Sequence, residues 1–457
     1  MPMEPRKVQS VAESVETPFR LRTEFMGGTY TDLIASWVQK RPEEPLQNLM
    51  QFFSVDNLRL AYREIPGSKA VGSDGITKEE YGRNLEDNLQ DLHQRMRKMA
   101  YIPSDARLVL IPKFDGGTRP IAISNFEDKL VQKIAADILT AIYDRSFKGS
   151  SFGFRPKKSC HTAISYLFNK LRKSNHSYVV DVDLKSFFNS IDHKLLIEVI
   201  QQRITEKTFL RYLVRMLKAG ILVEGISQKA EAGTPQGSIV SPVLANIFLH
   251  EVLDKWFEET IQPELGGELA RYADDFVAVF SNKDKADEFM RRLEDRLNSY
   301  HLSLNREKTK VINFNRDDSK RETFDFLGFT FYWGKPIQGN TILKVKTRMQ
   351  TFKKKIQEYK AWIQENRSHY KLSVLWKKTA QKLQGHYNYY GVLWNRAKLN
   401  HFYQSVTWIL FRWLNRRGQK KSYTWEGFKM RLGSLPLPLP TATNKLINLA
   451  NPRLYCA

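Results

Sequence analysis

The chain has 457 residues, of which 42% are hydrophobic and 12% aromatic, a composition that indicates a globular protein and excludes a disordered one. The 72 Lys and Arg residues outnumber the 49 Asp and Glu residues, for a net charge of +23, which favours a polyanionic partner such as nucleic acid. The length predicts two or three domains.

Membrane and disulfide-stabilised classes are not expected. The apolar run at 239–249 is short and interrupted by Ser and Pro, so no transmembrane helix is predicted. Residues 1–7 lack the apolar core of a signal peptide. The two cysteines, Cys160 and Cys456, are too few for a disulfide framework or a Cys-rich zinc site. We therefore expect a cytosolic protein with no membrane partner and no zinc.

The N-terminal part is predicted to be helical after a polar, irregular lead-in over 1–45. Apolar spacing indicates helices between 46 and 99, interrupted by the Gly-rich segment 67–75. That segment is either a turn between helices or a loop whose amides hold phosphate, and taken alone it favours the turn.

A β-hairpin is predicted next, with strands over 107–113 and 119–124 and a Gly-Gly turn between them. Lys113 and Arg119 stand at its shoulders and are suited to bind a triphosphate. In isolation, solvated charges on an edge strand would be the commoner explanation. After a helix over 128–143, the aromatic and basic loop 150–157 makes Arg155 a candidate for contacting nucleic acid.

Two acidic centres follow about ninety residues apart. Asp181 and Asp183 share one face of a strand over 178–188, and acids on such a face call for a cation or another partner. The small residues of 232–242 would let a ligand approach closely before a helix over 243–257. Asp274 and Asp275 then lie at the turn between two strands within 271–280, which can present both acids to one cation; an ordinary Asp-rich turn is the alternative.

The composition changes after residue 340. Between 341 and 420 there are 18 Lys and Arg residues, two acidic residues and 14 aromatic residues. The helical spacing of the rings places most of them in a core, but it does not explain the charge. A helical domain with a cationic exterior is a candidate surface for duplex or structured RNA.

Acids on two strands, a cationic hairpin and a cationic domain together indicate metal-dependent phosphoryl transfer on nucleic acid. Nuclease chemistry is the alternative, although a nuclease has no need of a triphosphate clamp.

The segment Tyr272-Ala273-Asp274-Asp275 matches the catalytic motif of reverse transcriptases. The motif order also resembles the reverse transcriptase/maturases of bacterial group II introns. The matching stretches are 72–75, 111–120, 151–156, 180–188, 233–246, 271–275, 305–309 and 326–329, and 383–390 resembles the maturase-specific thumb segment.

This resemblance implies an α+β right-hand polymerase with fingers, a palm with an antiparallel sheet, and an α-helical thumb. We expect a lead-in over 1–45, fingers and palm over 46–335, a thumb/maturase (X) domain over 336–435 and a tail over 436–457. Many relatives carry a zinc-containing nuclease tail. This chain resembles the lineages that lack the endonuclease domain.

The resemblance also implies functional residues. Asp183, Asp274 and Asp275 would be catalytic ligands of two Mg²⁺ ions, with Mn²⁺ as a substitute. In the family the ligand precedes the sugar-screening aromatic by five residues, which selects Asp183 over Asp181 and makes Phe188 the screen. The expected dNTP contacts are Lys113, Arg119, Phe188, Gln236 and Lys308. The expected nucleic-acid contacts are Arg155, Lys344, Lys346, Arg348, Lys353 and Lys354.

The implied activity is RNA-directed DNA synthesis in the bacterial cytosol. A DNA or RNA primer would be extended with dNTPs on an intron RNA template, and intron RNA binding would assist splicing and mobility. The sequence does not decide between a monomer and a homodimer. The alternatives are a domesticated or defence-associated reverse transcriptase without an intron, and a maturase acting mainly as an RNA-binding splicing factor. An RNA-dependent RNA polymerase is the least favoured, because Phe188 would exclude a 2′-hydroxyl.

Overall fold

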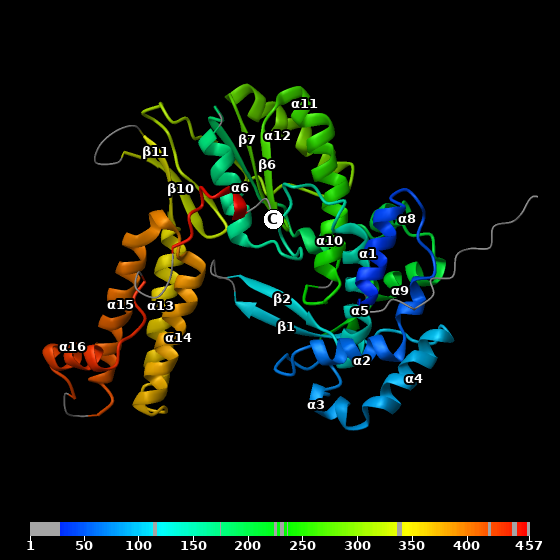
Figure 1. Ribbon diagram of the computed structural model, residues 1–457, viewed down its shortest axis with the longest axis horizontal. Coiled ribbons are helices and arrows are strands. Elements are labelled where there is room, and N and C mark those ends of the chain that lie inside the picture. Colours follow the sequence, from blue (N-terminus) through cyan, green and yellow to red (C-terminus); the bar gives the residue numbers. More distant parts are fainter. Residues whose placement is uncertain are drawn as a thin grey trace, which may run out of the picture.

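Three parts of the molecule surround the β1–β2 hairpin in the computed structural model (Figure 1). They are a group of N-terminal helices, a sheet covered by helices, and a C-terminal helical bundle. The structure describes residues 28–112, 117–173, 175–223, 226–228, 233–234, 236–335, 341–418, 422–440 and 446–454.

The N-terminal region contains a helix where an irregular lead-in was expected. Helix α1 (Tyr30–Lys40) begins at a capping box formed by Thr29 and Asp32, and Ile34 and Val38 are buried one turn apart. The Tyr30 hydroxyl donates to Asp137 of α5 (Phe126–Tyr143) at 2.8 Å. The lead-in prediction was therefore wrong for this segment, because a short cap and two apolar residues suffice for a packed helix.

The predicted helices and hairpin of the fingers are confirmed. The helices are α2 (Val55–Glu64), α3 (Lys78–Tyr81) and α4 (Leu85–Arg97). Strands β1 (Ala106–Pro112) and β2 (Thr118–Ile123) pair antiparallel. They belong to a sheet of order β2-β1-β4-β5, completed by β4 (Ile221–Val223) and β5 (Ile226–Gln228).

The palm is an antiparallel sheet, as predicted. Its strands, in the order in which they pair, are β6 (Glu268–Tyr272), β7 (Asp275–Phe280), β3 (Tyr178–Val182) and β8 (Lys310–Asn313). Because side chains alternate along each strand, Val180 and Ala278 face one apolar core while Val179 and Val277 face the other. A sheet that is buried on both faces holds its strand register firmly.

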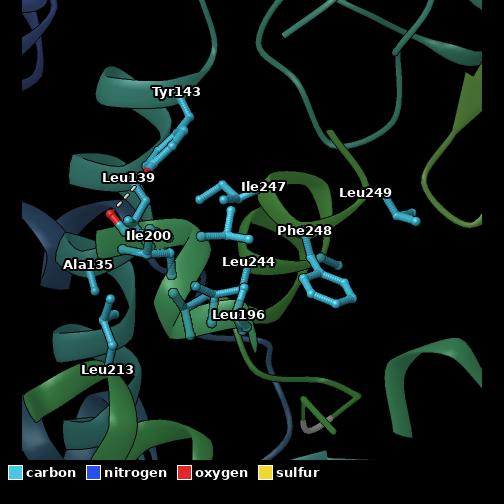
Figure 2. Close-up of a cluster of buried hydrophobic side chains, with 14 of the residues drawn as sticks. Ala135, Leu139, Tyr143, Leu196, Ile200, Leu213, Leu244, Ile247, Phe248 and Leu249 are labelled. Carbon is cyan, nitrogen blue, oxygen red and sulfur yellow. Dashed lines mark hydrogen bonds between the residues drawn. The ribbon is translucent and has the colours of Figure 1, made fainter. Parts of the chain in front are cut away.

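The larger core joins the palm to the fingers (Figure 2). It contains side chains of α5, α8 (His193–Gln201), α9 (Lys207–Leu217) and α10 (Ser241–Leu249). The Tyr143 hydroxyl reaches across this core and donates to the Ile200 carbonyl at 3.2 Å. The second face of the palm adjoins α6 (Cys160–Lys173), and α12 (Lys283–Asn298) covers the first.

The C-terminal domain begins within a hairpin. Strands β9 (Phe324–Phe326), β10 (Phe329–Gly334) and β11 (Ile342–Thr347) form a sheet of order β11-β10-β9. The expected boundary between 335 and 336 falls between the paired strands β10 and β11, so it does not separate two independent units. The bundle consists of α13 (Met349–Asn366), α14 (Leu372–Tyr390), α15 (Arg396–Leu414) and α16 (Trp425–Ser434).

The described end of the chain, 446–454, returns to the palm. Ser165 Oγ and Asn169 Nδ2 of α6 both donate to the Leu449 carbonyl, at 2.8 and 2.7 Å. Ile447 forms a bridge with Val392 at the end of α14. This segment therefore ties the helical bundle to the palm. No helix in the described ranges is long and apolar enough to span a membrane.

Candidate active site

Strand register brings the two acidic centres together. Val182 of β3 lies opposite Phe276 of β7, so Asp183, the next residue, reaches the end of the sheet where the β6–β7 turn lies. Ala273 in that turn adopts φ 58°, a left-handed conformation that costs roughly 1–2 kcal/mol for a residue with a Cβ. The turn therefore depends on its surroundings to hold Asp274 in place.

Asp183 is fixed by the segment that precedes β8. Asn305 Nδ2 donates to Asp183 Oδ2 at 2.9 Å, and the Asn305 amide donates to the Asp183 carbonyl at 2.8 Å. Lys308 Nζ lies 3.8 Å from the same carboxylate oxygen. The structure thus places the predicted substrate residue Lys308 beside a predicted metal ligand.

The acids of the turn repel one another. Burial and the negative charge of Asp183 raise the pKa of Asp274, and Arg119 counteracts part of this shift. Although the Asp275 side chain keeps contact with solvent, the surrounding protein desolvates it. Together with the charges of Asp181 and Asp274, this raises the pKa of Asp275 to about 7. The site accumulates negative charge that a cation would neutralise.

These carboxylates fit a divalent cation by their chemistry. Carboxylate oxygens are the ligands that Mg²⁺ prefers, and the raised pKa values show that the negative charge lacks compensation. In the part of the chain that the structure describes, however, no three His, Cys, Asp or Glu side chains converge closely enough to hold an ion. The acids are neighbours, and they do not form a closed coordination shell.

A buried arginine holds the acidic turn of Asp274 and Asp275 through its Ala273 carbonyl. The Arg271 side chain has no exposed surface and pairs with the equally buried Asp254, with an Nε–Oδ1 distance of 2.7 Å. Its Nη1 donates to Asn246 at 2.9 Å and to the Ala273 carbonyl at 3.0 Å, and its Nη2 donates to Ser151 Oγ at 2.7 Å. One guanidinium therefore holds the left-handed residue of the turn to three other segments.

The charge of this pair is compensated internally. Burial alone would raise the pKa of Asp254, but the Arg271 guanidinium brings it below its ordinary value. The motif comparison included Arg271 without assigning it a role. An Arg between apolar residues of a strand indicates that a buried acid pairs with it. The sequence does not reveal which acidic residue that is.

A glycine of the 150–157 loop packs against the backbone of the same turn. A Cβ on Gly153 would lie 2.4 Å from the Ala273 nitrogen and 2.9 Å from the Tyr272 carbonyl carbon. Asn246 Nδ2 also donates to the Gly153 carbonyl at 2.6 Å. This position accepts no side chain unless the acidic turn moves.

We expect Gly153→Ala to lower the rate of primer extension about a hundredfold, because a displacement of the catalytic group by about 1 Å costs that much. The matched control is Gly149→Ala in the same loop, where a Cβ meets nothing within 4 Å. Extension rates and melting temperatures of both variants check this. Equal rates for the two variants would show that the contact does not position the turn.

A loop joins the predicted sugar screen to the fingers. Phe188, in the short helix α7 (Phe187–Ser190), is half-buried, and its carbonyl accepts from the Thr234 amide at 2.6 Å. The Gln236 carbonyl accepts from the Ala122 amide of β2 at 2.6 Å. In the described part of the chain, the buried Oε1 of Gln236 has no hydrogen-bond partner.

The fingers hairpin contributes Arg119. It is exposed on β2 opposite Ile111, and it lies near enough to Asp274 to lower the pKa of that acid. The other predicted triphosphate contact, Lys113, lies outside the described residues.

The structure does not support Arg155 as a nucleic-acid contact. Its side chain is only 8% exposed and forms an ion pair of 2.7 Å with Asp144. It also donates to the carbonyls of Asp144, Lys148 and Ser151. The guanidinium holds its own loop together, and a contact of Arg155 with nucleic acid stays a prediction.

The predicted cations of the C-terminal domain follow β11 into α13. Lys344 and Lys346 alternate with buried residues of β11, and Lys346 Nζ lies 4.5 Å from the Tyr332 ring centroid. Lys344 lies over Trp394 at 5.7 Å. On α13, Lys353 is exposed and Lys354 lies 3.9 Å from Glu358.

Arg348 connects this row of cations to the acidic site. It pairs with Asp325 at 3.0 Å and lowers the pKa values of Asp181 and Asp275 in part. Burial and the Asp325 charge nevertheless raise the pKa of Asp181 to about 6. Asp181 thus lies among Asp325, Arg348 and Asp275, whereas Asp183 is bonded to Asn305 and lies near Lys308.

The fold and the acidic turn define a nucleic acid polymerase, and the comparisons identify its family. Residues 111–331 match the family described as reverse transcriptase (RNA-dependent DNA polymerase). Protein YkfC of Escherichia coli (strain K12) is 30% identical over 334 residues, which cover 65% of this chain and 85% of that protein. The chain therefore belongs to the reverse transcriptase family, whose polymerases generally need divalent metal ions.

Two further relatives connect the chain with introns. LtrA of Lactococcus lactis subsp. cremoris, a group II intron-encoded protein, is 36% identical over 198 residues, 43% of this chain and 33% of LtrA. A 91 kDa protein in the cob intron of Schizosaccharomyces pombe is 34% identical over 203 residues, 44% of this chain and 25% of that protein. The matches span a third or less of these two proteins. The predicted resemblance to group II intron-encoded reverse transcriptases is confirmed.

Proposed function

We propose that this RNA-directed DNA polymerase extends a DNA or RNA primer with dNTPs on an intron RNA template. The observation that carries the proposal is the strand register, which brings Asp183 to the turn of Asp274 and Asp275. Asp183 and Asp274, with Asp275 beside them, would hold two divalent ions that activate the primer 3′-hydroxyl and stabilise the charge on the transferred phosphoryl group.

The remaining side chains have roles that follow from their positions. Arg119 lies near Asp274 and Lys308 near Asp183, and both would neutralise the triphosphate of the incoming dNTP. Gln236 would contact the nucleotide through its side-chain amide, whose buried Oε1 has no hydrogen-bond partner among the described residues. The row Lys344, Lys346, Arg348, Lys353 and Lys354 contacts the phosphates of the bound nucleic acid.

Primer extension tests this function. An RNA template annealed to a short primer is incubated with dNTPs and Mg²⁺, and the products are resolved by length. Template-directed extension is the expected result. Cleavage of the template without extension would support a nuclease instead.

Phe188 sets the choice of sugar in this proposal, because its ring would occupy the space of a ribose 2′-hydroxyl. Phe188→Ala should raise the ratio of kcat/KM for NTPs to that for dNTPs by about tenfold or more. Phe188→Tyr keeps the ring and should retain the wild-type ratio. Single-nucleotide incorporation with each substrate gives the ratios, and an unchanged ratio in Phe188→Ala would remove Phe188 from this role.

A second function, assistance to splicing, is supported by the intron-encoded relatives and by the cationic C-terminal domain. Its surface would bind intron RNA through phosphate contacts that involve no step at the acidic turn. DNA synthesis can be removed without loss of RNA binding, since only synthesis depends on the carboxylates.

A further inference from the structure

A groove between α13 and α15 combines cationic and aromatic side chains. Its volume is about 380 Å³. Its lining includes Lys360 and Gln364 of α13, and Trp408, Arg412, Trp413 and Arg416 of α15 and the turn that follows it. None of its described lining residues is acidic, so the groove favours an anionic ligand.

The charged side chains of the groove are accessible. Lys360, Arg412 and Arg416 are all exposed, as is the Gln364 amide. The Arg416 guanidinium lies 4.9 Å from the Trp413 ring centroid. Among the described residues it forms a cation–π contact with this ring and no ion pair with an acid. Guanidinium groups in this arrangement suit phosphate oxygens.

Trp408 supplies a flat apolar surface at the same place. It is 49% exposed, and Trp425 of α16 supports it edge-on, with a centroid distance of 5.4 Å and an interplanar angle of 76°. Such a ring, rigidly backed and open to solvent, is a platform on which a nucleobase stacks.

The groove is remote from the acidic turn. Helix α13 begins directly after β11, and the start of α15 is tied to the end of β11 because the Thr347 amide donates to Asn395 Oδ1 at 2.8 Å. Lys360 lies eleven residues into α13, which is about 16 Å along the helix axis. A ligand in the groove therefore lies about three turns of α13 from the helix end that adjoins β11.

We propose that this groove binds an unpaired segment of RNA, with a base stacked on Trp408 and the adjoining phosphates on Arg412 and Arg416. The proposal rests on the proposed RNA-binding role of the domain and assigns it a second, single-stranded contact. A duplex would present phosphates to the arginines, but its paired bases could not reach Trp408. An acidic peptide would also pair with the arginines, without a ring to cover the indole.

The test uses the full chain with its polymerase site occupied by a primer–template duplex. Binding of a fluorescein-labelled, unstructured 12-nucleotide RNA is followed by fluorescence anisotropy at several salt concentrations. Trp408→Leu should weaken binding about five- to 150-fold, and Trp408→Phe should restore most of the affinity. Arg412→Ala and Arg416→Ala should each reduce the slope of log affinity against log salt by about 0.7.

The controls separate this site from general charge and from catalysis. Arg211→Ala removes an exposed arginine of α9 and should leave RNA affinity unchanged. Trp408→Leu should extend a short primed template at the wild-type rate. If the wild-type chain itself shows no polymerase activity, that result contradicts the proposed function and leaves the proposed groove untouched. Melting curves check folding, and if Trp408→Leu unfolds, Arg412→Glu carries the test with an expected loss of tenfold or more.

RNA affinity within twofold of wild type in both Trp408→Leu and Arg412→Glu would overturn the proposal. Displacement of the RNA by poly-glutamate, equally effective in wild type and Trp408→Leu, would also overturn it and indicate an acidic protein partner. Equal losses for RNA and DNA oligonucleotides would support a site for unpaired strands that does not read the 2′-hydroxyl.

Discussion

Asp274→Asn is expected to reduce dNTP incorporation on an RNA template on the order of a thousandfold. Asparagine keeps the size of the side chain but removes the charge that would hold a divalent ion. Loss of several kcal/mol of charge stabilisation translates into that factor at about 1.4 kcal/mol per tenfold. Single-nucleotide incorporation at saturating Mg²⁺ measures the effect, and the melting temperature should not fall, because one of several mutually repelling carboxylates is removed.

Asp181→Asn is the matched control, since Asp181 lies in the same sheet and beside Asp275 but is not an expected metal ligand. It should retain most of the activity. Asp274→Asn should also leave RNA binding and assisted splicing intact if these depend on the cationic domain. Wild-type incorporation by Asp274→Asn would remove this residue from the metal site, and a parallel loss of splicing would show that the two functions are coupled.

Arg271→Met is expected to lower the free energy of unfolding by about 3–5 kcal/mol, because it leaves the Asp254 carboxylate buried without its partner. Primer extension should fall as well, since the Ala273 carbonyl loses the donor that holds the turn. Chemical denaturation followed by circular dichroism, together with extension rates, measures both effects.

Two further variants show whether the losses in Arg271→Met come from the unpaired Asp254 or from the missing donor to the turn. Arg306→Ala breaks an exposed ion pair with Glu294 and should cost less than about 1 kcal/mol. The double variant Arg271→Met/Asp254→Leu removes both buried charges and should recover part of the stability. It should not recover extension, because the turn still lacks its donor. Recovery of both properties would show that Arg271 acts on stability alone.

Much of the site could be predicted because its chemistry follows strand patterns. Acids at the end of an alternating, β-branched segment mark Asp183, and the strand–turn–strand pattern marks Asp274 and Asp275. An antiparallel palm sheet then requires only that β3 and β7 pair in register for the acids to meet. Lys308, in contrast, was expected from the family resemblance alone, and its segment lies beside β3 because β8, which follows it, pairs with β3.

The parts that escaped prediction depend on contacts between distant segments. Asp254 lies seventeen residues before its partner, in a π-helical stretch (His250–Lys255) whose register no sequence period reveals. Arg155 has the composition of a surface residue, and only the positions of three carbonyls and Asp144 make it internal. The groove at Trp408 needs two helices side by side, whereas the aromatic spacing predicts only that most rings of this region lie in a core.

The most direct measurement of the central claim is single-nucleotide incorporation by the wild-type chain on an RNA template as a function of Mg²⁺ concentration. Incorporation should be absent in excess chelator, rise to saturation with added Mg²⁺, and be restored by Mn²⁺ when Mg²⁺ is withheld. Incorporation that persists in excess chelator would contradict a role for metal-bound Asp183 and Asp274. So would the absence of template-directed incorporation at every concentration of either ion.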